Sequence, residues 1–350
     1  MKEETATSSR KREHLQICCE QPVEAGDAGF GDVRLVHNAL SECDMDAIET
    51  KTRFLGATLG SPLFIAAMTG GHPDTLEVNQ RLARAAERYN LGMGVGSQRA
   101  ALEKPELEGS FTIVREEAPH AFLCANLGII QLRDHGIEWA ERAVEMIDAQ
   151  AIAIHVNSLQ EAIQPEGDHN AEGCIEALRN LCREFSYPVI VKETGSGISA
   201  GTARVIRGAG ASAIDIGGYG GTSWAKIERL RASGPELADL GEAFLSWGIP
   251  TVVSLHEVRT AGGPIIATGG LRSGIDIAKA VALGADLGGM ALPLLKPAME
   301  SDDALSRAVE AMHRELRVAM FLTGSRSIAD LRHARTYITG LTRQMIENSD

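Results

Sequence analysis

Short apolar runs recur along the chain, separated by longer stretches in which apolar residues return every three or four positions. Apolar runs of about four to eight residues, bounded by turn residues, are typical of strands that are buried on both faces. Eight segments have this pattern: Leu63–Ala67, Leu91–Val95, Phe122–Ala125, Ala151–Val156, Val189–Lys192, Ala213–Ile216, Ile265–Thr268 and Leu287–Met290.

Most intervals between these runs contain a stretch with helical periodicity, of which the clearest are Thr75–Tyr89, Glu138–Ile147 and Glu172–Phe185. Strands that alternate with helices imply parallel βαβ units, and eight such units indicate an α/β fold of the (β/α)8, or TIM barrel, type. A doubly wound open sheet is the alternative architecture.

The domain organisation follows from the same pattern. We expect residues 1–60 to form an N-terminal extension and residues 61–350 to form one barrel domain with C-terminal helices, because no single linker divides the chain. The tail Ser301–Asp350 has apolar residues at helical spacing and is predicted to form C-terminal helices.

Composition narrows the partners and the location. The formal net charge of −13 disfavours nucleic-acid binding. The sequence contains no run of about 18 apolar residues and no apolar signal core, so we expect a cytoplasmic protein with no membrane contact. The six cysteines show neither a C-x-x-C pair nor zinc-ligand spacing, which favours free thiols.

One strand end carries an unusual concentration of polar groups. The apolar segment Ala151–Ile154 leads directly into His155 and Asn157, and Gln160 and Glu161 follow. Ligands bind at the carboxyl ends of strands in parallel α/β folds, so this cluster is the first candidate for an active site. Taken alone, His155 would more often be a structural histidine of the core. Its position beside Asn157, Gln160 and Glu161 favours a role in the active site instead.

Other strand ends are rich in glycine. Glycine pairs occur at Gly70-Gly71, Gly269-Gly270 and Gly288-Gly289, and the segment 217–224 contains four glycines. Glycine-rich loops that follow the last two strands of such a barrel and lead into helices are typical phosphate sites. A tight turn is the alternative for each loop taken alone.

Charged groups accompany several of these ends. Arg99 could pair with a phosphate, although an exposed polar loop is the simpler interpretation of its segment. Lys192 ends an apolar strand, where it could neutralise a ligand, pair with Glu193 or extend to solvent. The basic run at Arg10 and Lys11 is either a solvated surface or, placed over the barrel mouth, an anion clamp.

Taken together, these motifs resemble the type 2, flavin-dependent isopentenyl-diphosphate isomerases. The resemblance runs in order from residue 10 to about residue 292. It rests on Arg10-Lys11-x-Glu13-His14, Met68-Thr69-Gly70-Gly71, Gly96-Ser97-Gln98-Arg99, Asn126-Leu127-Gly128, His155-Val156-Asn157, Gln160-Glu161, Lys192-Glu193, Gly217-Gly218-x-Gly220-Gly221-Thr222-Ser223-Trp224 and Gly269-Gly270-Leu271-Arg272.

The resemblance implies a barrel that binds FMN and Mg2+ and interconverts isopentenyl and dimethylallyl diphosphate, with NADPH reducing the flavin. It also implies a homo-oligomer, a tetramer or octamer. The FMN-binding residues would be Ala67, Met68, Thr69, Ser97, Asn126, Lys192, Gly217, Thr222, Gly270, Leu271, Arg272, Ala291 and Leu292. The diphosphate would contact Arg10, Lys11, Ser97, Gln98, Arg99, His155 and Gln160. Glu161 would bind the metal, and Gln160, His155 and Asn157 would serve catalysis.

Two other classes of function remain open: a redox enzyme on the same barrel, of which two types are considered, and a non-catalytic barrel. An FMN-dependent oxidoreductase similar to the 2-hydroxy-acid oxidases would need a histidine base near arginines at the seventh strand, and His256 with Arg259 precede that strand. An enzyme similar to inosine-monophosphate dehydrogenase would need a cysteine in residues 217–224, which contain none. A non-catalytic flavin- or phosphate-binding barrel would not need Glu161 beside Gln160.

Overall fold

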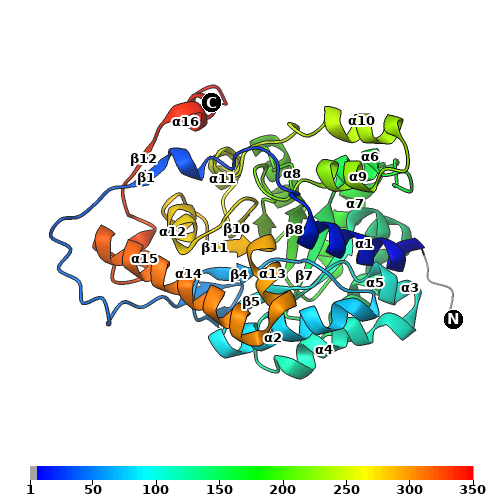
Figure 1. The fold of residues 1–350 in the computed structure, drawn as a ribbon, viewed down its shortest axis with the longest axis horizontal. Coiled ribbons are helices and arrows are strands. Elements are labelled where there is room, and N and C mark those ends of the chain that lie inside the picture. Colours follow the sequence, from blue (N-terminus) through cyan, green and yellow to red (C-terminus); the bar gives the residue numbers. More distant parts are fainter. Residues whose placement is uncertain (1–5, 350) are drawn as a thin grey trace.

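Eight parallel strands close into a barrel, in the order β10-β11-β4-β5-β6-β7-β8-β9. Figure 1 shows this computed structural model, which describes the backbone of residues 6–349 and the side chains of residues 11–349. The strands are β4 (Leu63–Ile65), β5 (Gly92–Gly94), β6 (Leu123–Gly128), β7 (Ala151–Val156), β8 (Val189–Glu193), β9 (Ala213–Asp215), β10 (Ile265–Thr268) and β11 (Leu287–Met290). The predicted barrel is confirmed, and the open sheet is wrong because β11 pairs with β4.

Helices connect the barrel strands and surround them. They are α2 (Leu76–Tyr89), α3 (Arg99–Glu103), α4 (Gly109–Glu117), α5 (Ile129–Met146), α6 (Ser158–Ile163), α7 (Cys174–Glu184), α8 (Ala200–Gly208), α9 (Trp224–Arg231), α10 (Pro235–Ala243), α11 (Thr251–Arg259) and α12 (Gly274–Ala282). Short 3-10 turns are η1 (Phe30–Asp32), η2 (Pro73–Thr75) and η3 (Pro105–Leu107). The three helical stretches predicted from periodicity are confirmed as α2, the second half of α5, and α7.

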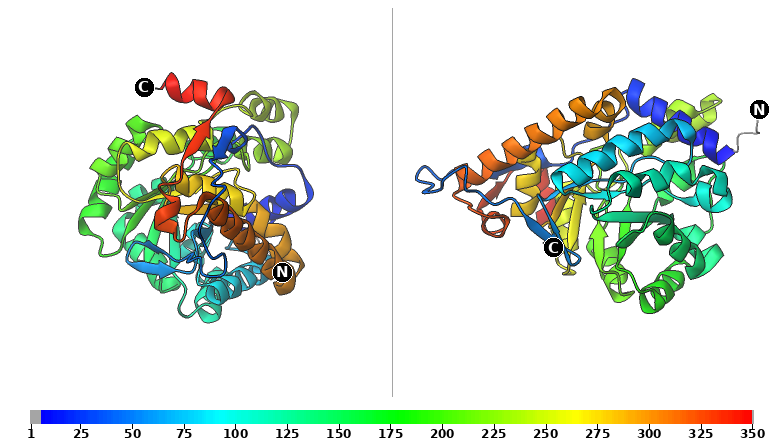
Figure 2. Two further views of the ribbon diagram at one scale, coloured as in Figure 1. Left: turned by 90° about the vertical axis from the view of Figure 1, so that its left-hand side faces the viewer. Right: turned by 90° about the horizontal axis from the view of Figure 1, so that it is seen from below.

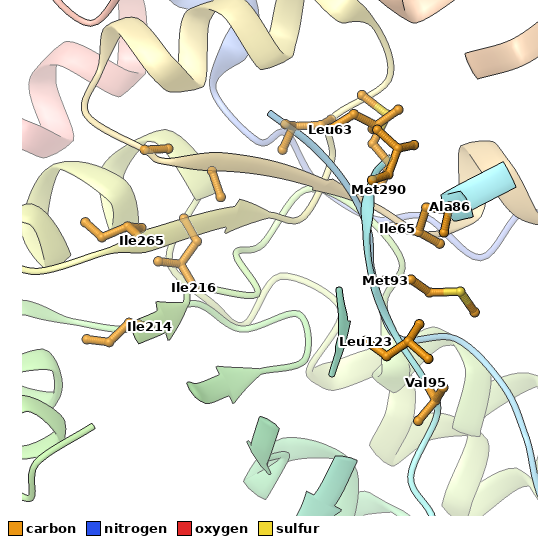
Figure 3. Packing of buried hydrophobic residues seen from close by; sticks show 14 of the residues in the cluster. Leu63, Ile65, Ala86, Met93, Val95, Leu123, Ile214, Ile216, Ile265 and Met290 are labelled. Carbon is orange, nitrogen blue, oxygen red and sulfur yellow. The ribbon is translucent and has the colours of Figure 1, made fainter. Parts of the chain in front are cut away.

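Alternate residues along each strand belong to two different apolar clusters. On β8, Val189 and Val191 belong to a large cluster that also contains helix residues, whereas Ile190 belongs to a second cluster. Figure 3 shows part of the large cluster, in which the strand residues Ile65 and Met93 lie near Ala86 of α2. The second cluster therefore fills the barrel interior, because successive side chains of a strand point to opposite faces.

A hairpin adds to the interior cluster. It consists of β2 (Thr52–Phe54) and β3 (Ala57–Leu59), which pair in antiparallel fashion. Phe54 lies edge-on to Phe122, with 5.9 Å between the ring centres, just before β6 begins. Residues at the amino ends of the strands are thus covered by the chain that precedes the barrel, and a ligand site is left to the carboxyl ends.

The chain after the barrel differs from the sequence prediction. Helices α13 (Leu292–Glu300) and α14 (Asp302–Thr323) are followed by α15 (Ile328–Leu331), strand β12 (Thr336–Ile338) and α16 (Gly340–Glu347). The predicted C-terminal helices are present, and the strand β12 between α15 and α16 was not predicted. Gly324 ends α14 with a φ of 73°, and β12 pairs with β1 (Val33–Leu35), a long-range contact that local periodicity does not reveal.

Helix α1 (Ala6–Glu20) packs against α9 and α13, which lie far from it in the sequence (Figure 2). Both partner helices begin at the carboxyl end of a barrel strand or in the loop that follows one. Helix α1 therefore lies at the end of the barrel where parallel α/β folds bind their ligands. No helix in the part of the chain that the structure describes is long and apolar enough to span a membrane.

Candidate active site

Along the barrel strands, the side chains that point into the interior are apolar at first and become polar toward the carboxyl ends. Two residues after each of the interior residues Cys124, Ala153, Ile190, Ala213 and Ile266, the sequence places a polar side chain. This layer, which we call the polar layer, consists of Asn126, His155, Lys192, Asp215 and Thr268. It lies at the carboxyl ends of five neighbouring strands, beneath a cavity of about 240 Å³.

Lys192 and Asp215 form an ion pair within this layer. They are register partners on β8 and β9, and Lys192 Nζ lies 3.2 Å from Asp215 Oδ2. Lys192 Nζ also donates a hydrogen bond to the carbonyl oxygen of Glu193, at 2.9 Å. The partner of the Lys192 charge is therefore Asp215, whereas the Glu193 carboxylate is engaged elsewhere.

The Glu193 carboxylate orders the loop after β8. Its Oε2 accepts hydrogen bonds from four successive backbone N–H groups, those of Thr194, Gly195, Ser196 and Gly197, at 2.6, 2.6, 2.5 and 3.2 Å. Because Thr194 and Gly195 line the cavity, this contact fixes one of its walls.

The orientation of His155 is set by Asn126. Asn126 Nδ2 donates to the carbonyl of Val95 at 2.9 Å, so its Oδ1 is left to accept from His155 Nδ1 at 2.8 Å. Nδ1 therefore carries the proton and Nε2 is the free acceptor of a neutral ring. Burial lowers the pKa of His155 to about 3, and the charges of Lys11 and Lys192 act in the same direction.

A second polar cluster lies on α6. Glu161 Oε1 accepts from Asn157 Nδ2 at 2.8 Å, and Oε2 accepts from Gln164 Nε2 at 2.7 Å and from the backbone of Asp168 at 2.9 Å. Asn157 Nδ2 also donates to Gln160 Oε1 at 3.1 Å. These contacts hold one carboxylate among N–H donors at the cavity wall, so a cation that bound Glu161 would have to displace at least one of these donors.

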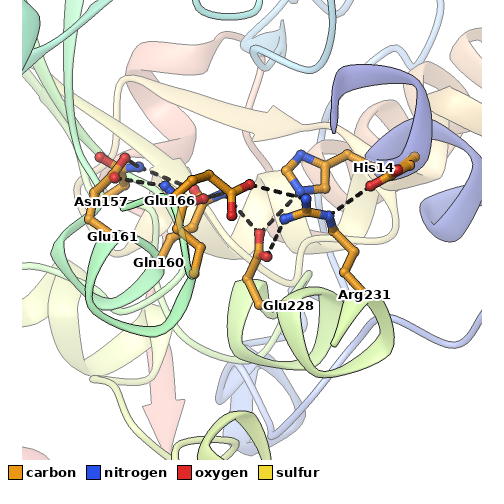
Figure 4. Close-up of polar contacts among 9 residues, drawn as sticks. His14, Asn157, Gln160, Glu161, Glu166, Glu228 and Arg231 are labelled. Atoms are coloured by element: carbon orange, nitrogen blue, oxygen red, sulfur yellow. Dashed lines mark hydrogen bonds and ion pairs between the residues drawn. The ribbon is translucent and has the colours of Figure 1, made fainter. Parts of the chain in front are cut away.

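Gln160 connects this cluster to helix α1, as Figure 4 shows. Its Nε2 lies 3.4 Å from Glu228 Oε1 on α9, which also lies 3.1 Å from His14 Nε2 on α1. Arg231 Nη1 donates to Glu228 Oε2 at 2.5 Å. Burial raises the pKa of Glu228, but the hydrogen bond and charge of His14 and the charge of Arg231 outweigh burial, and the pKa is lowered.

Arg99 and Gln98 point in different directions although they are adjacent. Arg99 lines the cavity and pairs with Glu103 at 2.7 Å and Asp168 at 3.4 Å. Gln98 is fully buried beneath the cavity wall, where it donates to the carbonyl of Ala143 at 2.8 Å and accepts from Asn126 N at 2.9 Å. The structure therefore does not bring Gln98 to the cavity, and its amide supports Asn126 instead.

Two glycine loops form the opposite wall. Gly269 and Gly270 have φ values of 104° and 76°, and a Cβ on Gly270 would lie 2.4 Å from the carbonyl oxygen of Gly220. Their backbones can therefore lie against the loop after β9 only because they lack side chains. Helix α13 begins at Leu292, beside Ala291, without a side-chain cap. Pro293 has no N–H and the N–H of Leu294 donates to the carbonyl of Ala291, so in the first turn the N–H of Leu292 is the one suited to a phosphate.

The structure brings nearly all the predicted site residues to one cavity. Those that line it are Lys11, Ala67, Met68, Thr69, Ser97, Arg99, Asn126, His155, Asn157, Gln160, Glu161, Lys192, Gly217, Thr222, Gly270, Leu271, Arg272, Ala291 and Leu292. Gln98 does not line it, and the side chain of Arg10 lies outside the described residues. His256 and Arg259 lie on α11 and do not line the cavity.

Sequence reasoning missed several residues of the site. Asp215 and Thr268 belong to the polar layer. They could have been found because each follows an interior residue, Ala213 or Ile266, by two positions and so points to the same side of its strand. His14 was left without a role, although it is part of the basic motif that begins at Arg10. Glu228 had no local signal, because only the packing of α9 brings it to Gln160 and His14.

Comparisons with known proteins agree with this geometry. A family model described as FMN-dependent dehydrogenase matches residues 132–338, and the chain is therefore a member of the class of FMN-dependent (β/α)8 barrels. Relatives named isopentenyl-diphosphate delta-isomerase include one from Methanoregula boonei, 65% identical over 98% of this chain and 97% of its own. Another, from Archaeoglobus fulgidus, is 50% identical over 98% of this chain and 99% of its own.

The chain belongs to the family of isopentenyl-diphosphate delta-isomerases, in its type 2, flavin-dependent form. The predicted family is thus confirmed, as are the assignment to the isomerases and the expectation of FMN.

Solved structures support the barrel more broadly. A lactate oxidase of Pediococcus acidilactici, described as putative, has a TM-score of 0.66 and 19% identity, with 93% of this chain and 87% of that chain covered. A mandelate oxidase has a TM-score of 0.65 and 18% identity, with 95% and 99% covered. At this identity the likeness concerns the fold alone.

The lowered pKa of His155 predicts a pH dependence of stability. An unfolded histidine has a pKa of about 6.5, whereas that of His155 is about 3, so the unfolded state binds more protons between these values. The free energy of unfolding should therefore rise with pH across this window, by up to about 1.4 kcal/mol per pH unit from this residue. The measurement is denaturant unfolding of ligand-free protein at several pH values.

The variant His155→Gln should lose this contribution, so its difference from wild type should change across the window. His37→Gln, an exchange at an exposed histidine, is the matched control and should follow wild type. Parallel stability curves for wild type and His155→Gln would show that the ring is not held neutral.

Proposed function

We propose that this chain interconverts isopentenyl diphosphate and dimethylallyl diphosphate with reduced FMN and Mg2+, and that NADPH reduces the flavin. The observation that carries the proposal is the combination of an FMN barrel with the Glu161, Asn157 and Gln160 cluster at its mouth. An oxidase mechanism lacks comparable support, since His256 and Arg259 lie away from the cavity.

The cavity residues fit FMN. The uncapped start of α13 and the loop at Gly270 and Leu271 would bind its phosphate through backbone N–H groups. Met68, Thr69 and Thr222 would contact the ring and ribityl chain, and the polar layer would lie beneath them. Reduced FMN, when bound, supplies a group that can give a proton to a substrate carbon or take one from it.

Two cationic side chains and one neutral histidine of the cavity fit a diphosphate. Lys11, Arg99 and His155 line one cavity, although they come from α1, α3 and β7. An anion beside His155 would offset the burial and the neighbouring charges that lower its pKa, so the ring could take a proton and donate from Nε2. Glu161 would hold Mg2+, which keeps several waters and shares the phosphate oxygens.

Gln160 would serve the reacting carbons, and Glu228 would support its amide from outside the cavity. Gln160 lines the cavity, and its amide is oriented by Asn157 on one side and Glu228 on the other. A neutral amide is a poor base, so its part is to position groups and to relay hydrogen bonds. Glu228, held ionised by His14 and Arg231, does not line the cavity and would act on the site through its contact with Gln160.

An anaerobic assay tests the proposal. Purified protein loaded with FMN, reduced by dithionite or NADPH, should convert isopentenyl diphosphate to dimethylallyl diphosphate when Mg2+ is present. NADPH should not be consumed in proportion to product, because the reaction involves no net redox change. Flavin reduction by a 2-hydroxy acid without isomerisation would support an oxidase instead, and a protein that takes up no FMN would overturn the proposal.

The variant Glu161→Gln tests the metal site. Removing the one carboxylate of the α6 cluster should lower Mg2+-dependent kcat/KM by at least about a hundredfold, since metal stabilisation of the charge is worth several kcal/mol. FMN affinity, followed by flavin fluorescence, should stay within about twofold. The control Glu172→Gln makes the same charge change at an exposed position, and equal activity of the two variants would remove Glu161 from the metal site.

The variant Lys11→Ala tests whether residues 1–60 contribute to the substrate clamp. Loss of a charge-assisted contact to the diphosphate should raise KM about tenfold or more, with a smaller change in kcat and in FMN affinity. Lys51→Ala, at a side chain that is 68% exposed, is the matched control. An unaltered KM in Lys11→Ala would show that α1 does not contact the substrate.

A further inference from the structure

Asp215 is an interior residue for which the proposed reaction has no direct use. It lies on β9 in the polar layer, its side chain is 3% exposed, and it is the ion-pair partner of Lys192 at 3.2 Å. Lys192 lines the cavity, whereas Asp215 lies behind it. A carboxylate in this place changes the net charge of the cavity floor without contacting a ligand.

The contacts around Asp215 suit a carboxylate. Thr268 Oγ1 accepts from the backbone N–H of Gly217 at 2.9 Å, so its own proton is directed to Asp215 Oδ1, with which it is in contact. Asp215 thus accepts from Thr268 on one oxygen and faces the Lys192 ammonium with the other. A buried carboxylate in this position is stabilised only while both partners are present.

We propose that Asp215 is a positioning residue that neutralises Lys192 and thereby lowers the reduction potential of the bound flavin. A cation beside a flavin favours the reduced form, which can carry negative charge, and a paired cation favours it less. The floor of the cavity holds a neutral pair in place of a lone positive charge. This inference rests on FMN binding under the proposed function, and it concerns the flavin before any substrate is added.

The pair also suits acid–base chemistry. An unpaired Lys192 would favour loss of a proton from the reduced flavin, whereas the neutral pair leaves that proton more firmly held near neutral pH. A group that exchanges protons works best when its proton affinity matches the working pH. Asp215 would therefore adjust the flavin toward proton transfer, through Lys192.

The test is the midpoint potential of FMN-loaded protein without substrate, measured against reference dyes under anaerobic conditions. Asp215→Asn leaves Lys192 unneutralised and should shift the equilibrium toward reduced flavin by at least about tenfold, about 30 mV for two electrons. Lys192→Met should shift it in the opposite direction. The double variant, whose floor is again neutral, should return toward wild type, which a merely structural role of Asp215 would not produce.

Asp286→Asn is the matched control. Asp286 is a partly buried aspartate that pairs with Arg332 and accepts from the backbone of Ile265, where β10 begins. The same charge change there should leave the potential unaltered.

An unchanged potential in Asp215→Asn with FMN bound would overturn the inference. If that variant does not retain flavin, the double variant decides, because the loss of both charges leaves no unpaired ion. A potential as low in the double variant as in Lys192→Met would show that Lys192 acts without Asp215. Wild-type protein that takes up no FMN would instead overturn the proposed function.

Discussion

Closure of the barrel is the constraint on which the site depends. Because β11 pairs with β4, the sheet has a true interior, and every second residue of each strand must face it. Apolar residues such as Ile190 fill the lower part, and polar residues such as Lys192 follow two positions later. A register shift of one residue would place Lys192 among the aliphatic side chains beneath the helices, so packing and function select the same register.

The polar layer is stable because its members satisfy one another. The Lys192–Asp215 pair, the Thr268 hydroxyl and the Asn126–His155 contact leave few unpaired polar groups in the interior. The structure thus pairs Lys192 with a carboxylate inside the barrel of an acidic chain. Arg99, which pairs with Glu103 and Asp168, follows the same rule at the rim. The ion pairs therefore offset the desolvation of these charged side chains before any ligand binds.

Much of the fold could be predicted from the sequence, because a barrel strand is a local signal. Apolar runs such as Ala151–Ile154 predict the strands, and the polar residues at the ends of those runs predict the site. Contacts between distant segments could not be predicted in this way. Part of the tail is a strand because β12 pairs with the distant β1. Gln98, which was expected to bind the substrate, is instead buried beneath the cavity wall. Glu228 reaches Gln160 only through the packing of α9.

Barrels with the same fold can differ in the segments that lie outside the barrel strands. Oxidases with 18–19% identity share the fold, so the fold does not choose the reaction. In this chain, α6 and α1 carry Glu161, Gln160 and His14, which belong to a network that joins the cavity wall to the preceding helix. Because these residues stand outside the barrel strands, they could change without disturbing the interior alternation. Under the proposed function, the barrel would supply the site for the flavin, and the segments at its carboxyl end would select the substrate.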